Sequence, residues 1–165
     1  MRDVFGIFIL ILASIGIGFI VADLQGAFTT EAAEVGQAQS ILREEVDMVQ
    51  LTNDYRVTKN LAPLTEDHKL VVSAQEKADT LCRTGEFTHE SGGEEFYKPI
   101  DRSGYNYKKA GENLAKGFKT TSKAFQGLLD SPSHLANIVD DFREIGVGFN
   151  RCEGKNYYVI HYGEK

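Results

Sequence analysis

The sequence predicts an α+β domain that follows a single apolar N-terminal helix. Apolar residues recur every three or four positions through residues 42–81 and again through 120–138, which is the spacing of amphipathic helices. Near the end of the chain, Ile145, Val147 and Phe149 alternate with small or polar residues, as in a half-buried strand. Helices that come first and a hairpin that comes last favour the α+β class.

The first segment, residues 1–22, is predicted to be a membrane anchor. Its 19 residues from 4 to 22 carry no charge, and a helix of that length spans about 28 Å, close to the hydrocarbon core of a bilayer. A basic residue precedes the stretch and acidic residues follow it, so the rest of the chain is expected outside. A cleaved signal peptide is the alternative, but the stretch is longer than a usual signal core and lacks a small-x-small cleavage site. The protein is therefore expected to be single-pass at the cell membrane, or secreted if the segment is cleaved.

A stalk and a globular domain follow the anchor. Residues 23–40 are small and polar and are interpreted as the stalk, which leaves 41–165 as the domain. The first helix of this domain is expected to bury one stripe of residues: Leu42, Val46, Val49 and Asn53.

The second helix of the domain has clear end signals. Glu66 and Asp67 are expected to open it, since acidic groups suit a helix N-terminus, and Gly85 is expected to end it. Its buried face is predicted to contain Leu70, Ala74, Ala78 and Leu81. The chain between residues 87 and 111 is expected to be a loop.

Two further helices and a hairpin complete the prediction. Thr120 or Thr121 caps the start of one helix, and Ser131-Pro132 opens a shorter one. A turn through residues 153–156 joins the strand around Val147 to a final strand at 157–162.

Composition limits the classes of partner. The 165 residues include 18 basic and 24 acidic ones, a net charge of -6, and no Lys/Arg cluster occurs along the sequence. We therefore expect no nucleic-acid partner.

Two cysteines, Cys82 and Cys152, lie in the exported part. An even pair in an oxidising compartment is a disulfide candidate, and closing so long a loop would stabilise the fold by roughly 4 kcal/mol. Two buried free thiols are the alternative.

The titratable residues with the most informative surroundings are His89, Glu112 and His134. A carboxylate within an apolar segment, such as that of Glu112, caps backbone donors or pairs with a cation or metal. His68, in the first turn of a helix, is expected to be solvated, and His161, in the last strand, is expected to serve packing or pairing.

Seven motifs stand in order along the domain: Asn53-x-x-Arg56, Pro63-Leu64, Phe87-Thr88-His89, Gly111-Glu112-Asn113-Leu114, Ser131-Pro132-Ser133-His134 with Asn137-Ile138, Ile145-Gly146-Val147-Gly148 and Tyr157-Tyr158-Val159. In this order and spacing the chain resembles the CAP superfamily, prokaryotic type, over about residues 46 to 163. That superfamily, also called SCP-like, includes plant pathogenesis-related proteins, insect venom antigens and exported prokaryotic proteins.

The resemblance implies an α-β-α sandwich with a central antiparallel sheet and a cleft of two histidines and two acids that binds a divalent cation in some members. His89, Glu112 and His134 match three of these positions. The place of the second acid falls at or near Ser131, with Asp130 beside it, which departs from the family pattern.

The matched residues suit a metal ion in their own right. Two imidazoles and one carboxylate form a familiar open Zn²⁺ arrangement, with Ca²⁺ or Mg²⁺ as further candidates. The alternative is that His89, Glu112 and His134 form a hydrogen-bonded cluster that braces the sheet.

Three functions remain open. The first is a non-catalytic, membrane-tethered module that binds an ion, lipid or cell-wall component, the second a metal-dependent hydrolase such as a peptidase, and the third a module that binds another exported protein. Proteolysis and sterol binding are proposed for some members of the resembled family, and neither activity transfers by fold. No H-E-x-x-H motif and no convincing Ser-His-Asp order occurs in the sequence, which favours binding over catalysis.

Overall fold

The computed structural model describes residues 33–165. Residues 41–165 form one compact unit, separate from the segment that ends at Ser40. The predicted anchor at residues 1–22 lies outside the described residues, as does the first part of the stalk, whereas 33–40 are helical. Across 33–165, no helix combines the length and the apolar character needed to cross a bilayer.

A four-stranded mixed sheet forms the centre of the unit at residues 41–165. Its strands, in spatial order, are β1 (Thr65–Glu66), β3 (Glu144–Cys152), β4 (Lys155–Glu164) and β2 (Lys109–Lys116). The pairs β3·β4 and β4·β2 are antiparallel, as expected. The short β1 runs parallel to β3, so the prediction of a wholly antiparallel sheet was wrong at this edge.

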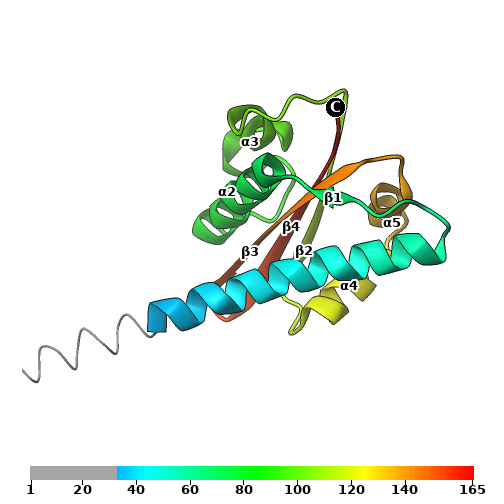
Figure 1. The fold of residues 1–165 in the computed structure, drawn as a ribbon. Coiled ribbons are helices and arrows are strands. Elements are labelled where there is room, and N and C mark those ends of the chain that lie inside the picture. The colour runs from blue at the N-terminus through cyan, green and yellow to red at the C-terminus, as the bar shows by residue number, and fades with distance from the viewer. Residues whose placement is uncertain (1–32) are drawn as a thin grey trace, which may run out of the picture. The chain divides into compact units, whose positions relative to one another are not determined.

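Helices cover both faces of the sheet (Figure 1). They are the N-terminal helix (33–58), α2 (His68–Thr84), α3 (Tyr97–Arg102), α4 (Thr121–Leu129) and α5 (Pro132–Val139), with a short 3₁₀ turn at Ser91–Gly93. One face packs against α4, α5 and the N-terminal helix from residue 41 onward, and the other packs against α2. The predicted α+β class is therefore confirmed.

Strand β4 illustrates how alternation builds the two cores. Tyr158, Ile160 and Tyr162 enter the larger core with α4 and α5. Tyr157 and Val159 point the other way, toward α2. Because successive side chains of a strand face opposite sides, His161 also lies on the α2 side.

Helix α2 lies unusually close to β3. A Cβ atom added at Gly146 or Gly148 would collide with the backbone of Leu70 or Ala74. These two glycines are therefore required for close approach, and that approach brings the buried polar side chains of α2 against the sheet.

The ends of α2 follow the sequence signals with one change. Asp67 is the N-cap, and its carboxylate accepts hydrogen bonds from the backbone of Lys69 and Leu70. Gly85 ends the helix at φ 73°, a left-handed conformation that glycine adopts without strain. Glu66, expected inside the helix, instead pairs with Ile145 as part of β1.

The N-terminal helix buries only part of the predicted stripe, since Val49 and Asn53 are half-buried and the other two members are not. Leu42 and Val46 are 59% and 61% exposed, whereas Met48, Thr52 and Arg56 are buried. Arg56 is buried because its guanidinium donates hydrogen bonds to the carbonyl groups of the following loop and of the α5 end: Ala62, Ile138 and Asp140.

The segment 87–111 is more regular than predicted. It contains α3, and β2 begins at Lys109. The Gly-Glu-Asn motif forms a strand because it pairs along β4, with Glu112 opposite His161.

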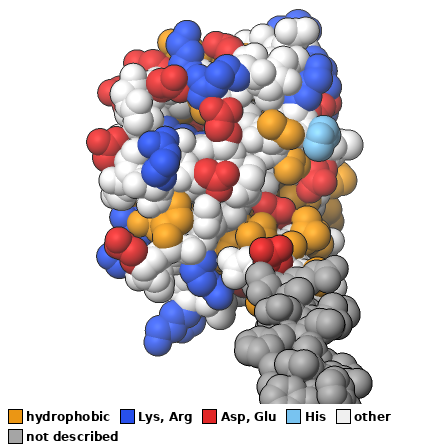
Figure 2. All heavy atoms as spheres, turned by 90° about the vertical axis from the view of Figure 1, so that its left-hand side faces the viewer, with side chains coloured by type: hydrophobic (Ala, Val, Ile, Leu, Met, Phe, Trp, Pro, Cys, Tyr) orange, Lys and Arg blue, Asp and Glu red, His pale blue; other side chains and the backbone are white. Residues whose placement is uncertain are grey.

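The predicted disulfide is confirmed. Cys82, near the end of α2, is bonded to Cys152 at the end of β3, with 5.9 Å between their Cα atoms. It ties α2 to the β3–β4 hairpin. On the face shown in Figure 2, hydrophobic side chains form separate groups among acidic and basic ones.

Candidate functional site

Glu112 on β2 is the centre of a buried polar cluster on the α2 face of the sheet. Only 1% of its side chain is exposed. Its Oε1 lies 2.7 Å from Nδ1 of His89, and its Oε2 lies 3.1 Å from Nε2 of His161. An ionised carboxylate only accepts hydrogen bonds, so both imidazoles donate to it.

His161 is the site residue that sequence reasoning missed. The sheet register places it directly opposite Glu112, and its Nδ1 lies 2.8 Å from Oγ of Ser73 on α2. Ser73 and His161 are fully buried. The signal that could have identified His161 was the pairing of the Gly-Glu-Asn segment with the last strand, which required recognising β2.

His89 is held by its backbone and by Glu112. The buried ammonium group of Lys77 on α2 donates to the His89 carbonyl oxygen over 2.5 Å. The other side of the His89 side chain stays open, since 53% of it is exposed. Only one of its ring nitrogens, Nδ1, is used by Glu112, which leaves Nε2 available.

The charges in the cluster reinforce one another. Burial raises the pKa of Glu112, but hydrogen bonds from His161 and His89 and the positive charge of Lys77 outweigh burial, so this pKa lies below its usual range. The hydrogen bond to Glu112 raises the pKa of His89 above that of an ordinary imidazole. His89 and Glu112 are thus a charge-assisted pair at mildly acidic pH.

His134 belongs to α5 and stands apart from this pair. Within residues 33–165 its imidazole makes no hydrogen bond with His89 or Glu112. Burial lowers the pKa of His134, and repulsion from His89 lowers it further. Its backbone carbonyl accepts a hydrogen bond from Asn113, next to Glu112, which ties α5 to β2.

The remaining predicted residues, Ser131 and Asp130, differ in their surroundings. Ser131 shares a pocket with His134, whereas Asp130 is exposed and bonded to Gln126. In the part of the chain that the structure describes, no three His, Cys, Asp or Glu side chains are grouped to hold a metal ion. Metal binding by His89, Glu112 and His134 stays a prediction.

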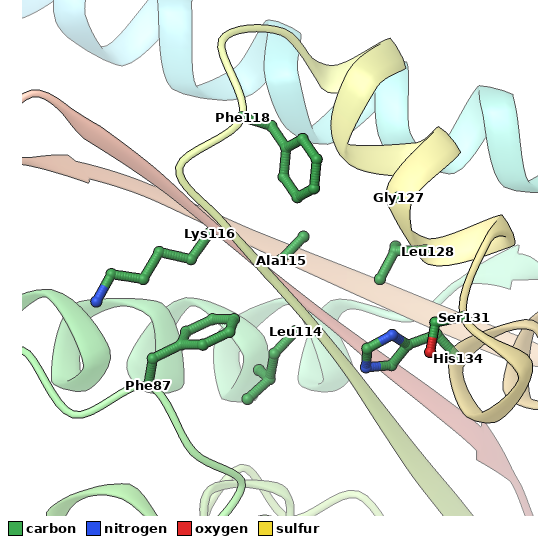
Figure 3. Close-up of a pocket in the computed structure, with 9 residues that line it drawn as sticks. All are labelled: Phe87, Leu114, Ala115, Lys116, Phe118, Gly127, Leu128, Ser131 and His134. Atoms are coloured by element: carbon green, nitrogen blue, oxygen red, sulfur yellow. The ribbon is translucent and has the colours of Figure 1, made fainter.

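A pocket of about 230 Å³ opens beside His134 (Figure 3). Leu114, Phe118 and Leu128 supply apolar walls, with His134 at one end and Lys116 at the other. The Lys116 ammonium lies over two aromatic rings, at 5.6 Å from Phe87 and 4.8 Å from Tyr157. The pocket therefore offers an apolar interior between an imidazole and a fixed positive charge.

Comparison with known proteins identifies relatives of most of the domain. The sequence profile of the cysteine-rich secretory protein (CAP) family matches residues 49–162. The uncharacterised protein YkwD of Bacillus subtilis is 36% identical over 114 residues, which cover 67% of this chain and 44% of that protein.

Solved structures share the fold. An extracellular protein containing an SCP domain from Bacillus anthracis has a TM-score of 0.70 at 24% identity, covering 76% of this chain and 41% of that one. An outer surface protein from Borrelia burgdorferi has a TM-score of 0.65 at 24% identity, covering 71% and 89%. The chain thus spans less than half the length of its Bacillus relatives.

Proposed function

Because the chain belongs to the cysteine-rich secretory protein (CAP) family, we propose that it is an exported, membrane-tethered binding module whose pocket beside His134 takes a small ligand. The observation that carries this proposal is the contrast between two groups of polar residues. His89 and His134 border accessible space, whereas Ser73 and His161 are sealed in the interior. The accessible groups are suited to contact a ligand, and the sealed ones to hold the sheet and α2 together.

The sealed group has the order of hydrogen bonds found in hydrolases, Ser73 to His161 to Glu112. A nucleophilic serine must reach its substrate, yet the relative exposure of Ser73 is 0%. Its hydroxyl also lies 2.9 Å from the Leu70 carbonyl oxygen within α2. We therefore assign this group a bracing role and favour binding over covalent catalysis.

The tether is proposed from residues 1–22, and an extracellular location agrees with how the Bacillus anthracis and Borrelia relatives are described. N-terminal sequencing of protein taken from its native membrane tests it. We expect the apolar stretch to remain in the mature chain. A mature chain that begins near Asp23 would contradict the anchor and indicate a secreted protein.

A divalent cation is part of the proposal, with a revised role for Glu112. Both oxygens of Glu112 already accept hydrogen bonds, and Lys77 adds positive charge close by. A histidine that ligates a metal commonly donates its other ring nitrogen to a carboxylate, which is the bond that His89 Nδ1 makes here. We therefore assign His89 Nε2 and His134 as the ligands and Glu112 as the group that orients His89. Two imidazoles suit Zn²⁺ better than Ca²⁺ or Mg²⁺, which prefer oxygen ligands, and bound Zn²⁺ would supply a Lewis acid at the pocket.

Zinc is expected to raise the melting temperature of the parent protein, and His89→Ala or His134→Ala is expected to abolish that shift. At a zinc concentration of 100 times the dissociation constant the stabilisation is about 2.7 kcal/mol. As the pH is lowered, the affinity for Zn²⁺ should begin to fall while the pH is still above 6.5, because the raised pKa of His89 lets protons compete with the metal for its imidazole. Thermal melts with and without Zn²⁺, at several pH values, measure both effects.

The matched control is His68→Ala, which removes an exposed histidine at the start of α2 and should leave the zinc response unchanged. A parent protein without any zinc response, together with a destabilised metal-free His89→Ala variant, would support the bracing role alone. An equal loss in all three variants would identify non-specific binding.

A further inference from the structure

A second pocket, of about 310 Å³, lies between the β2–α4 loop and the turn of the β3–β4 hairpin. Its lining is polar and glycine-rich: Gly117, Phe118, Lys119, Arg151, Gly154 and Asn156. It shares only Phe118 with the pocket beside His134 and contains neither His89, Glu112 nor His134.

Basic side chains that lie far apart in the sequence meet around this pocket. They are Lys119 from the β2–α4 loop and Arg151 from the hairpin. Residues 113–129 contain no acidic residue, although the whole chain has an excess of acids. The hairpin turn adds a single carboxylate, Glu153.

Lys119 and Arg151 are among the cations of residues 33–165 that form no ion pair. Arg102, Lys109 and Lys165 each form ion pairs with two carboxylates. Within residues 33–165, neither Lys119 nor Arg151 lies within ion-pair distance of an Asp or Glu. Within residues 33–165, no ion pair therefore neutralises the positive charge of the pocket.

The buried Asn156 holds the two walls of the pocket in place. Its Oδ1 accepts a 2.6 Å hydrogen bond from Arg151 Nε, and its Nδ2 donates to the Phe118 carbonyl over 3.0 Å. The backbone N–H of Gly117 donates to the Asn156 carbonyl over 2.8 Å. Arg151 thus forms hydrogen bonds through Nε alone, and its guanidinium lies over the Phe149 ring at 5.7 Å, while its two terminal nitrogens make no hydrogen bond to residues 33–165.

We propose that this pocket binds a phosphate group. A guanidinium with both terminal nitrogens available offers paired donors that match two oxygens of a phosphate, and the Lys119 ammonium adds a second charge. The pocket is larger than one phosphate ion, which leaves room for the molecule that carries the group. The proposal is independent of His89 and His134 and would survive a failure of the zinc experiment.

The test measures binding of inorganic phosphate to the full-length chain in neutral detergent, by NMR titration at constant ionic strength. We expect shifts confined to the signals of Gly117, Gly154 and Arg151. The double variant Lys119→Gln/Arg151→Gln is expected to weaken binding about tenfold or more, the loss that goes with charge-assisted hydrogen bonds.

The matched control is Lys98→Gln/Arg143→Gln, which removes the same charge from exposed residues outside the pocket. The control should bind phosphate like the parent, and unfolding midpoints should show that both double variants fold. Equal weakening in both variants, unchanged binding in the pocket variant, or shifts spread over all the lysines would overturn the proposal.

Two further arms identify the source of the phosphate. Glycerol 3-phosphate represents a soluble ester, and phosphatidylglycerol vesicles, compared with phosphatidylcholine vesicles, represent a lipid headgroup. Binding to either that depends on Lys119 and Arg151 supports the site and names its source. Vesicle binding that persists in the pocket variant, together with no phosphate binding by the parent, would overturn the proposal. The membrane contact would then lie outside this pocket.

Discussion

Replacement of both cysteines, Cys82→Ser/Cys152→Ser, is expected to lower the free energy of unfolding by roughly 4 kcal/mol in the chain-entropy model. The disulfide joins residues 70 positions apart, so it removes much of the conformational freedom of the unfolded chain. In the folded state it lies against the small core formed by Leu81, Leu114 and Tyr157, and the serine hydroxyls would be placed partly within that core.

Urea unfolding of the parent and the double variant measures this loss. A reductant should destabilise the parent to about the same extent and leave the variant unchanged. A parent protein that keeps its stability under reducing conditions would contradict the prediction, since the cross-link would then contribute nothing.

Glu112→Gln is expected to lower the free energy of unfolding by about 3 kcal/mol, the cost of removing one partner from a buried charged network. The amide keeps the size of the side chain but offers only one acceptor oxygen for His89 and His161. The pKa of His89 should fall at the same time, because the hydrogen bond that its Nδ1 donates to Glu112 is the main cause of the elevation.

The pH dependence of this loss has a definite sign. The pKa of Glu112 is lowered in the folded state. Its contribution to the free energy of unfolding is therefore present above the unfolded pKa of 4.5 and disappears as the pH falls through the folded pKa. The folded pKa of His89 is raised, so its contribution is present below the unfolded value of 6.5 and disappears as the pH rises through the folded pKa. The parent and the variant should therefore differ most between pH 4.5 and 6.5.

Chemical unfolding across this pH range, together with NMR titration of His89, measures both effects. The exposed Glu95→Gln is the matched control and should change stability by no more than about 0.5 kcal/mol. A Glu112→Gln variant that is as stable as the parent near the middle of this pH range would contradict the stabilising role of the carboxylate.

Much of the local architecture could be predicted because its causes are local. The boundaries of α2 follow from the acid Asp67 at its start and Gly85 after its end, and its buried face follows from helical spacing. The β3–β4 hairpin follows from alternation around a turn. Family membership was also predicted, since seven short motifs preserve their order and spacing in a single chain.

The errors have a different origin, in contacts between distant segments. The first helix turns Arg56 inward because backbone carbonyls more than 80 residues away need donors, which places Leu42 and Val46 on the outer side. Strand β1 exists only because Thr65 and Glu66 pair with β3. Hydrophobic spacing in one helix contains no information about such partners.

The sequence by itself indicated the fold class, the α2 helix and the hairpin, named Cys82 and Cys152 as a disulfide candidate and, through the family resemblance, assigned His89 and Glu112 to one cleft. Only the tertiary structure decided which further side chains join them. Sheet register set His161 against Glu112, and the packing of α2 set Ser73 behind His161. The same folding gathered Lys119 and Arg151 into one pocket, although no basic cluster exists along the chain. The physical reason is that register and packing are fixed by the free energy of the whole core, which links residues that the sequence keeps far apart.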